Sequence, residues 1–128
     1  MEIDPGFAAA YHNKGILLSK LGRYQEAVDC YDSALKLDPM SANTWLSKAY
    51  ALLELKRDLE VVDCCDRALQ LDPKCAGAWA NKGIALAKLC RNREAIDCLQ
   101  RYVELAPPEY ASQVRSAKEY IGQLKQNL

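Results

Sequence analysis

The sequence predicts an all-α fold of antiparallel helix pairs stacked along one axis, with about seven helices in all. Three observations lead to this prediction. The first is a set of prolines spaced 34 residues apart, at Pro5, Pro39, Pro73 and Pro107. The second is internal similarity, because residues 8–39 and 76–107 are identical at 16 of 32 aligned positions. The third is the recurrence of apolar residues three and four positions apart within each period, which is typical of one face of a helix.

The period divides the chain into repeats at residues 8–41, 42–75 and 76–107, each expected to form two helices. The turn between the two helices falls at Gly22, Lys56 or Cys90. Glycine suits the left-handed conformation that ends a helix, so the lysine and the cysteine should cost some backbone strain. The closing proline cannot continue the second helix, and it disfavours helical geometry in the residue before it.

The two ends of the chain depart from the repeat. Residues 1–7 are expected to be the tail of a truncated preceding repeat, and residues 108–128 a C-terminal capping helix. Apolar residues in that last segment form one stripe, made of Tyr110, Val114, Ala117, Ile121, Leu124 and Leu128. The opposite face is polar with charges of both signs and has no Trp or Phe, which favours a solvent-facing cap over a membrane-surface helix.

Composition excludes several classes of function. The chain has 128 residues with 17 Lys and Arg against 17 Asp and Glu, so its formal net charge is zero, and we expect no nucleic-acid partner. No apolar stretch approaches the ~20 residues of a membrane span, and we expect no membrane partner. Six cysteines in a chain rich in helix signals favour reduced thiols over a secreted disulfide scaffold. We therefore expect a cytoplasmic protein.

No group of residues predicts catalysis. Cys30, Cys64 and Cys98 recur at the repeat period, but packed helices lie about 8–10 Å apart, too far for a disulfide or a shared zinc ion. We expect separate thiols there, with Cys65 a small core residue. His12 is the only histidine, and no phosphate loop, nucleophile elbow or metal motif is present. We therefore predict no catalytic residue, no metal site, no cofactor and no enzymatic activity.

The spacing of key residues resembles the tetratricopeptide repeat, whose pattern is W-x2-L-G-x2-Y, then A-x3-F, then P over 34 residues. The matching residues are Tyr11, Gly15, Leu18, Ala27, Tyr31 and Pro39 in the first repeat, Trp45, Ala49, Leu52, Val61, Cys65 and Pro73 in the second, and Trp79, Gly83, Leu86, Ala95, Leu99 and Pro107 in the third. In one departure, Lys14, Lys48 or Lys82 replaces the first Leu. A lysine stem lies along a core while its ammonium reaches water, so the assignment stands.

The resemblance implies a right-handed superhelix in which the first helix of each repeat lines a concave groove that binds partners. The expected groove residues are His12, Asn13, Ile16, Lys20, Leu46, Ser47, Tyr50, Leu53, Asn81, Ile84 and Lys88. Asn13, Ser47 and Asn81 are 34 residues apart, and stacked asparagines offer hydrogen bonds to an extended peptide, although Ser47 interrupts the series. The alternative is that these side chains cap or hydrate their own helices.

Family members that grip the C-terminal carboxylates of cytosolic heat-shock chaperones use lysines, asparagines and an arginine at five groove positions. This sequence has His12, Ile16, Ser47, Gly77 and Asn81 there, so a dicarboxylate clamp is absent. We therefore predict a scaffold or adaptor module that binds a peptide segment of a partner protein by apolar contacts and backbone hydrogen bonds. The alternative is a structural module that self-associates, stacking end to end through an exposed first repeat that includes Ala10 and Leu17.

Overall fold

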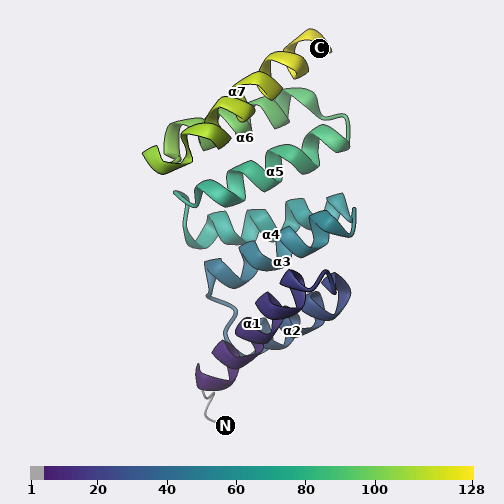
Figure 1. Ribbon diagram of the computed structural model, residues 1–128, viewed down its shortest axis with the longest axis vertical. Coiled ribbons are helices and arrows are strands. Elements are labelled where there is room, and N and C mark those ends of the chain that lie inside the picture. The colour runs from purple at the N-terminus through teal and green to yellow at the C-terminus, as the bar shows by residue number, and fades with distance from the viewer. Residues whose placement is uncertain (1–4) are drawn as a thin grey trace.

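The computed structural model describes residues 5–128, which form seven α-helices and one short 3₁₀-helix and contain no strand (Figure 1). The elements are α1 Pro5–Lys20, α2 Tyr24–Leu37, α3 Ala42–Glu54, α4 Asp58–Leu71, α5 Ala76–Lys88, α6 Asn92–Leu105, η1 Pro108–Tyr110 and α7 Ala111–Gln126. The predicted all-α class and helix count are confirmed.

The helices form antiparallel pairs stacked along the long axis of the molecule, with the two ends of the chain at opposite ends of the stack (Figure 1). Each helix packs against the next one in the chain, and the first helices of successive pairs, α1, α3 and α5, also contact one another. This second set of contacts lines up the first helices along one side of the stack.

The start of α1 differs from the expectation for residues 1–7. Residues 5–7 form the first turn of α1 rather than a linker, and residues 1–4 lie outside the described part of the chain. Proline is tolerated in a first turn because its missing N–H has no partner within the helix there, so Pro5 does not prevent the helix from starting.

The turns inside the pairs have the predicted left-handed conformation. The backbone φ angle is 77° at Gly22, 61° at Lys56 and 62° at Cys90. At each turn the next residue donates its N–H to a carbonyl five residues earlier, as Arg57 does to Leu52 at 3.0 Å. Lys56 and Cys90 therefore hold a conformation that costs side-chain-bearing residues free energy.

Small residues of the repeat are buried in the core. Ala27, Ala49, Val61 and Ala95 are fully buried where the helices of a pair come close together. A Cβ atom placed on Gly15 would lie 2.5 Å from the ring of Tyr31, so glycine is required for α1 to approach that ring. Cys65, predicted to be a core residue, is fully buried, and all six cysteines are free thiols as expected.

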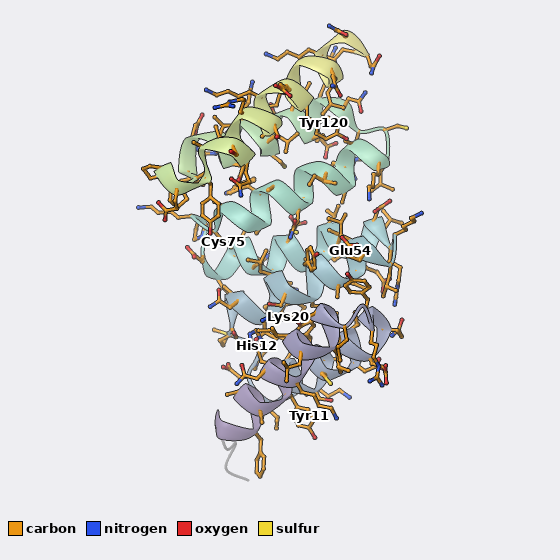
Figure 2. The ribbon with its side chains drawn as sticks, in the orientation of Figure 1. Tyr11, His12, Lys20, Glu54, Cys75 and Tyr120 are labelled. Atoms are coloured by element: carbon orange, nitrogen blue, oxygen red, sulfur yellow. The ribbon has the colours of Figure 1, made fainter. Side chains whose placement is uncertain are left out.

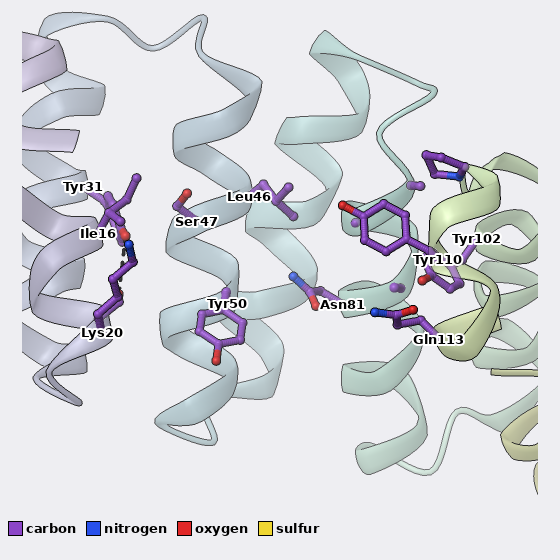
Figure 3. Close-up of a pocket in the computed structure, with 15 residues that line it drawn as sticks. Ile16, Lys20, Tyr31, Leu46, Ser47, Tyr50, Asn81, Tyr102, Tyr110 and Gln113 are labelled. Carbon is purple, nitrogen blue, oxygen red and sulfur yellow. Dashed lines mark hydrogen bonds between the residues drawn. The ribbon is translucent and has the colours of Figure 1, made fainter. Parts of the chain in front are cut away.

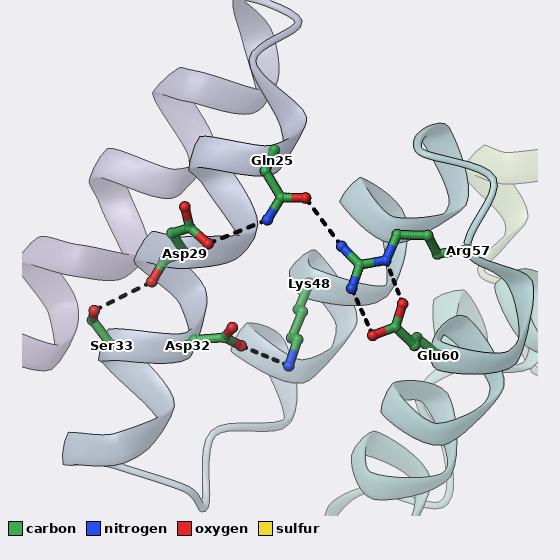
Figure 4. Close-up of polar contacts among 7 residues, drawn as sticks. All are labelled: Gln25, Asp29, Asp32, Ser33, Lys48, Arg57 and Glu60. Carbon is green, nitrogen blue, oxygen red and sulfur yellow. Dashed lines mark hydrogen bonds and ion pairs between the residues drawn. The ribbon is translucent and has the colours of Figure 1, made fainter.

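Two of the three lysines that replace leucine, Lys48 and Lys82, connect neighbouring helix pairs. Lys48 Nζ lies 2.6 Å from Asp32 of α2 (Figure 4). In the same way, Lys82 Nζ lies 2.7 Å from Asp66 of α4. Their side chains are only 20% and 22% exposed, which confirms that the stems are packed while the ammonium groups reach an exposed partner. The aspartate partners could not be assigned from the sequence, because the pairing depends on how successive repeats stack.

A further polar contact crosses the same boundary. Arg57, just before α4, bonds Glu60 and also donates to Gln25 of α2 at 3.0 Å (Figure 4). The equivalent Arg23 and Arg91 bond Glu26 and Glu94 at the starts of α2 and α6. Such exposed pairs contribute little stability each, because water and salt screen their attraction.

Among residues 5–128, no helix combines the length and the hydropathy needed for a membrane span.

Candidate peptide-binding groove

A pocket of about 740 Å³ lies along the first helices and is open to solvent (Figure 3). Helices α1, α3 and α5 form its wall, and η1 with the start of α7 closes one end. We call this pocket the groove. It is lined by Ile16, Ser19, Lys20, Tyr31, Leu46, Ser47, Tyr50, Ala76, Gly77, Ala80, Asn81, Tyr102, Pro107, Tyr110 and Gln113.

Small residues on α5 make room for the centre of the groove. Gly77 has no side chain, and Leu46 of α3 extends into that space: a Cβ atom on Gly77 would lie 3.1 Å from Leu46 Cδ2. With Ala76 and Ala80 beside it, this part of α5 exposes little more than backbone. The groove is therefore wide and apolar opposite Leu46.

Four tyrosines supply most of the aromatic surface: Tyr31, Tyr50, Tyr102 and Tyr110. The hydroxyl of Tyr31 lies 3.4 Å from Ser19 Oγ, and the ring of Tyr50 meets the ring of Tyr24 edge-on with centroids 6.4 Å apart. Burial raises the pKa of Tyr31, Tyr50 and Tyr102 above the usual value of 10. The phenols of Tyr31, Tyr50 and Tyr102 are therefore neutral near pH 7 and can serve as hydrogen-bonding groups.

Lys20 is the one charged residue among those that line the groove. The other polar side chains are neutral: Asn81 and Gln113 carry amides, and Ser19 and Ser47 carry hydroxyls. An amide side chain both donates and accepts hydrogen bonds, so it matches the N–H and C=O groups of a peptide backbone. The groove can therefore hold a peptide with apolar side chains and form hydrogen bonds with some of its backbone N–H and C=O groups.

The structure brings together six of the predicted residues: Ile16, Lys20, Leu46, Ser47, Tyr50 and Asn81 all line the groove. His12 and Asn13 instead line a smaller pocket of about 240 Å³ formed by α1, the end of α2 and the start of α3. Leu53 is only 9% exposed and belongs to the core cluster, because its side of α3 faces neighbouring helices. Ile84 is half-buried against the same core, and Lys88 is exposed outside both pockets.

Sequence reasoning missed the far side of the groove. Tyr102 comes from α6, Tyr110 from η1 and Gln113 from α7, whereas only first helices were expected to contribute. Tyr31 was identified only as a residue of the repeat pattern; it is buried, yet it also lines the groove. One available signal was Tyr102 itself, since the other repeats have Ala34 and Ala68 at that position.

His12 forms part of a hydrogen-bonded group with α3. Its Nδ1 lies 3.0 Å from Thr44 Oγ1, which lies 2.9 Å from Ser41 Oγ, and Ser41 also accepts the Thr44 backbone N–H at the start of α3. Burial lowers the pKa of His12 below its usual value of 6.5, so the neutral ring is favoured. This histidine is a helix-to-helix contact within a polar group.

No metal-binding cluster of three or more His, Cys, Asp or Glu side chains occurs within residues 5–128. The buried thiols are poor nucleophiles, because burial raises the pKa of Cys64 to about 11 and that of Cys65 further. The arrangement thus offers shape and hydrogen bonding rather than reactive groups.

Stacked helix pairs with a continuous groove along their first helices define the chain as a helical-repeat protein. A tetratricopeptide repeat model matches residues 8–41, and a second model of the same description matches residues 48–122, more than half of the chain. The chain belongs to the tetratricopeptide repeat (TPR) family.

Solved structures share this fold over nearly the whole chain. The TPR domain of OM64 from Arabidopsis is 26% identical with a TM-score of 0.89, covering 97% of this chain and 98% of that one. The first TPR of Spaghetti (RPAP3), solved bound to the HSP90 peptide SRMEEVD, is 27% identical with a TM-score of 0.83, covering 95% and 98%. The first TPR domain of human RPAP3 is 26% identical with a TM-score of 0.82, covering 98% and 100%. Among curated proteins, no relative matched the chain.

Proposed function

We propose that this chain is a non-enzymatic interaction module that binds an extended peptide segment of a partner protein in the groove. The observation that carries the proposal is the groove itself: an open, mostly apolar channel of about 740 Å³ along the first helices, with amide side chains at Asn81 and Gln113. A pocket of this size and character suits a peptide, whose apolar side chains gain from burial while its backbone needs hydrogen-bond partners.

The comparisons support peptide binding as the general mode. The first TPR of Spaghetti (RPAP3) was solved bound to a short HSP90 peptide, and its alignment covers 95% of this chain. The mode proposed here differs in its chemistry. None of His12, Ile16, Ser47, Gly77 and Asn81 carries a cation at neutral pH, so a pair of carboxylates would find no charge-assisted partners there. We infer recognition by apolar contacts and backbone hydrogen bonds.

We place this role in the cytoplasm as a scaffold or adaptor, because six free thiols persist in a reducing compartment. The partner is a protein or peptide, not a nucleic acid or a membrane. The zero net charge gives no long-range attraction to phosphate groups.

Selection from a peptide library tests the proposal. The wild type is compared with a groove variant, Tyr50→Ala/Asn81→Ala, and with a control double variant, Leu59→Ala/Asn127→Ala, which removes an exposed leucine and an asparagine away from the groove and from α1. We expect the wild type and the control to enrich one motif and the groove variant to lose it. Enrichment of the same peptides by all three proteins, or of none by any, would overturn groove binding.

A second measurement tests the absence of the clamp. We expect the selected peptide to bind equally well with a free or an amidated C-terminus. A loss of more than about tenfold on amidation would show that a terminal carboxylate is recognised, against the proposed mode.

The alternative function, self-association by end-to-end stacking, is favoured by exposed apolar side chains on α1, where Leu17 is 62% exposed. It ranks second because stacking would pair α1 with the other end of the molecule. Throughout α7, all of which the structure describes, no large hydrophobic side chain is exposed. The test is the molecular mass as a function of concentration: a mass that rises with concentration for the wild type but not for Leu17→Glu would support stacking.

A further inference from the structure

Helix α1 has a second exposed surface, distinct from the groove. It consists of Phe7, Ala10, Tyr11, Lys14 and Leu17, together with Leu21 directly after the helix, and we call it the outer face of α1. Its large apolar side chains are exposed, with Phe7 at 61%, Leu17 at 62% and Leu21 at 70%. Figure 2 shows Tyr11 on the side of α1 turned away from α3, whereas His12 and Lys20 lie toward α3. A run of apolar side chains this exposed on one helix marks an interaction surface.

The repeat shows what normally covers this face. Thirty-four and sixty-eight residues further on, the same register positions lie on α3 and α5. There Ala51 and Ala85, equivalent to Leu17, are fully buried, and Thr44 and Ala78, equivalent to Ala10, are 4% and 0% exposed. Helix α2 packs on α3 and helix α4 packs on α5. In both cases the face is covered by a helix, and only the copy on α1 is open.

A lysine occupies the same repeat position on α1, α3 and α5. Lys48 pairs with Asp32 of the covering helix α2 at 2.6 Å, and Lys82 pairs with Asp66 of the covering helix α4 at 2.7 Å. Lys14 is the equivalent residue on α1. It is exposed and forms no ion pair with any residue between 5 and 128. The open face thus presents a cation where each covered face binds a carboxylate.

This charge argues against a second copy as the occupant. Lys14 lies seven positions from both Phe7 and Leu21, at the centre of the outer face. A symmetric dimer through two such faces would bring the two Lys14 ammonium groups together, and like charges at an interface are unfavourable. Head-to-tail stacking would instead use the C-terminal segment, where the exposed large hydrophobic side chains among residues 106–128 are Tyr110 and Leu128, one on each side of α7 and far apart along it.

We propose that the outer face of α1 binds an amphipathic helix from outside residues 5–128, with a carboxylate placed to pair with Lys14. The apolar side of that helix packs on Phe7, Leu17 and Leu21. Because Leu17 stands where α3 and α5 have alanine, we expect the partner helix to carry a small residue opposite it. This surface is separate from the groove, so the proposal stands independently of peptide binding there.

The test uses a covering helix of this chain as the probe, added in trans. The probe is a helix-stapled peptide of residues 57–73 with Cys64→Ala and Cys65→Ala; a second probe also carries Asp66→Lys. The receptors are the wild type, Leu17→Ala, Lys14→Glu, Leu17→Glu and a matched control, Leu59→Glu, which changes an exposed leucine elsewhere. All substituted receptor positions are exposed, so each variant should fold, as circular dichroism would verify.

We expect the Asp66 probe to bind the wild type or Leu17→Ala roughly three- to tenfold more tightly than the lysine probe. Lys14→Glu should reverse that preference, Leu17→Glu should abolish binding, and Leu59→Glu should leave it unchanged. No binding to either the wild type or Leu17→Ala, or a probe preference that Lys14→Glu does not alter, overturns the proposal. So does a concentration-dependent dimer of the wild type that Leu17→Glu abolishes, because a second copy would then occupy the face.

Discussion

Leu46 fills the space that a side chain at position 77 would need, since a Cβ atom on Gly77 would lie 3.1 Å from Leu46 Cδ2 and 3.4 Å from Cδ1. This contact joins α3 to α5 in the middle of the groove. The contact between Leu46 and Gly77 therefore determines both the shape and the apolar character of this part of the groove.

The Leu46 contact predicts the effect of Gly77→Ala. Leu46 borders an open pocket and can move by the few tenths of an ångström required, while alanine gains about 1 kcal/mol of helix propensity over glycine. We expect unfolding stability within about 1 kcal/mol of wild type, measured in urea, but several-fold weaker binding of groove-selected peptides. A variant that binds as tightly as the wild type would show that peptides do not contact this part of the groove.

Two further glycines form a matched pair for stability. Gly15→Ala would place a methyl group 2.5–2.9 Å from ring atoms of the buried Tyr31, and we expect a loss of about 1–3 kcal/mol. At Gly122 an added methyl group would have no neighbour within 4 Å. We therefore expect Gly122→Ala to raise the free energy of unfolding by about 1 kcal/mol, because alanine has a higher helix propensity than glycine. Urea unfolding of both variants checks the opposite signs, and equal effects would contradict the packing interpretation.

The strained turns predict stabilising substitutions. Lys56 and Cys90 have φ values of 61° and 62°, which glycine adopts without strain. We expect Lys56→Gly and Cys90→Gly each to raise the free energy of unfolding by about 0.5–1 kcal/mol. Gly22→Ala, at the equivalent turn, should lower it by a similar amount. Thermal unfolding of the three variants provides the measurement, and destabilisation by both glycine substitutions would argue against backbone strain.

His12 predicts a pH dependence of stability. Its pKa is lowered in the folded state, so the unfolded chain takes up a proton first as the pH falls. The contribution of the neutral ring is therefore present above pH 6.5 and is lost below it. Between pH 7.5 and 5.5, we expect the free energy of unfolding, measured in urea, to fall more for the wild type than for His12→Gln, whose side chain does not titrate. Parallel pH profiles would show that His12 makes no such contribution.

Thiol labelling predicts an order of reactivity. Cys90 is exposed at a turn, whereas Cys64, Cys65 and Cys98 are buried and burial raises their pKa. We expect a thiol reagent at pH 8 to modify Cys90 within seconds to minutes and the three buried thiols only after denaturation. A Cys90→Ser variant serves as the control. Rapid labelling of Cys65 in the native protein would contradict its place in the core.

The sequence by itself determined the repeat, the helix pairs and their turns. A 34-residue period, helical spacing of apolar residues and punctuation by proline are local properties, so they appear in the order of residues without any knowledge of packing. The positive φ angles at Gly22, Lys56 and Cys90 could be predicted in the same way, from the position of the turn within the repeat. For the groove, the register of first helices identified Ile16, Leu46, Tyr50 and Asn81 among its lining residues.

Only the tertiary structure decided how the repeats meet. The angle between successive pairs buries Leu53, moves His12 and Asn13 into a separate pocket, and brings Tyr102, Tyr110 and Gln113 across to close the groove. The same stacking pairs Lys48 and Lys82 with aspartates of the preceding pair and leaves Lys14 exposed. These relationships join residues from different helix pairs, and their geometry depends on how side chains interlock at each interface, which no local pattern records.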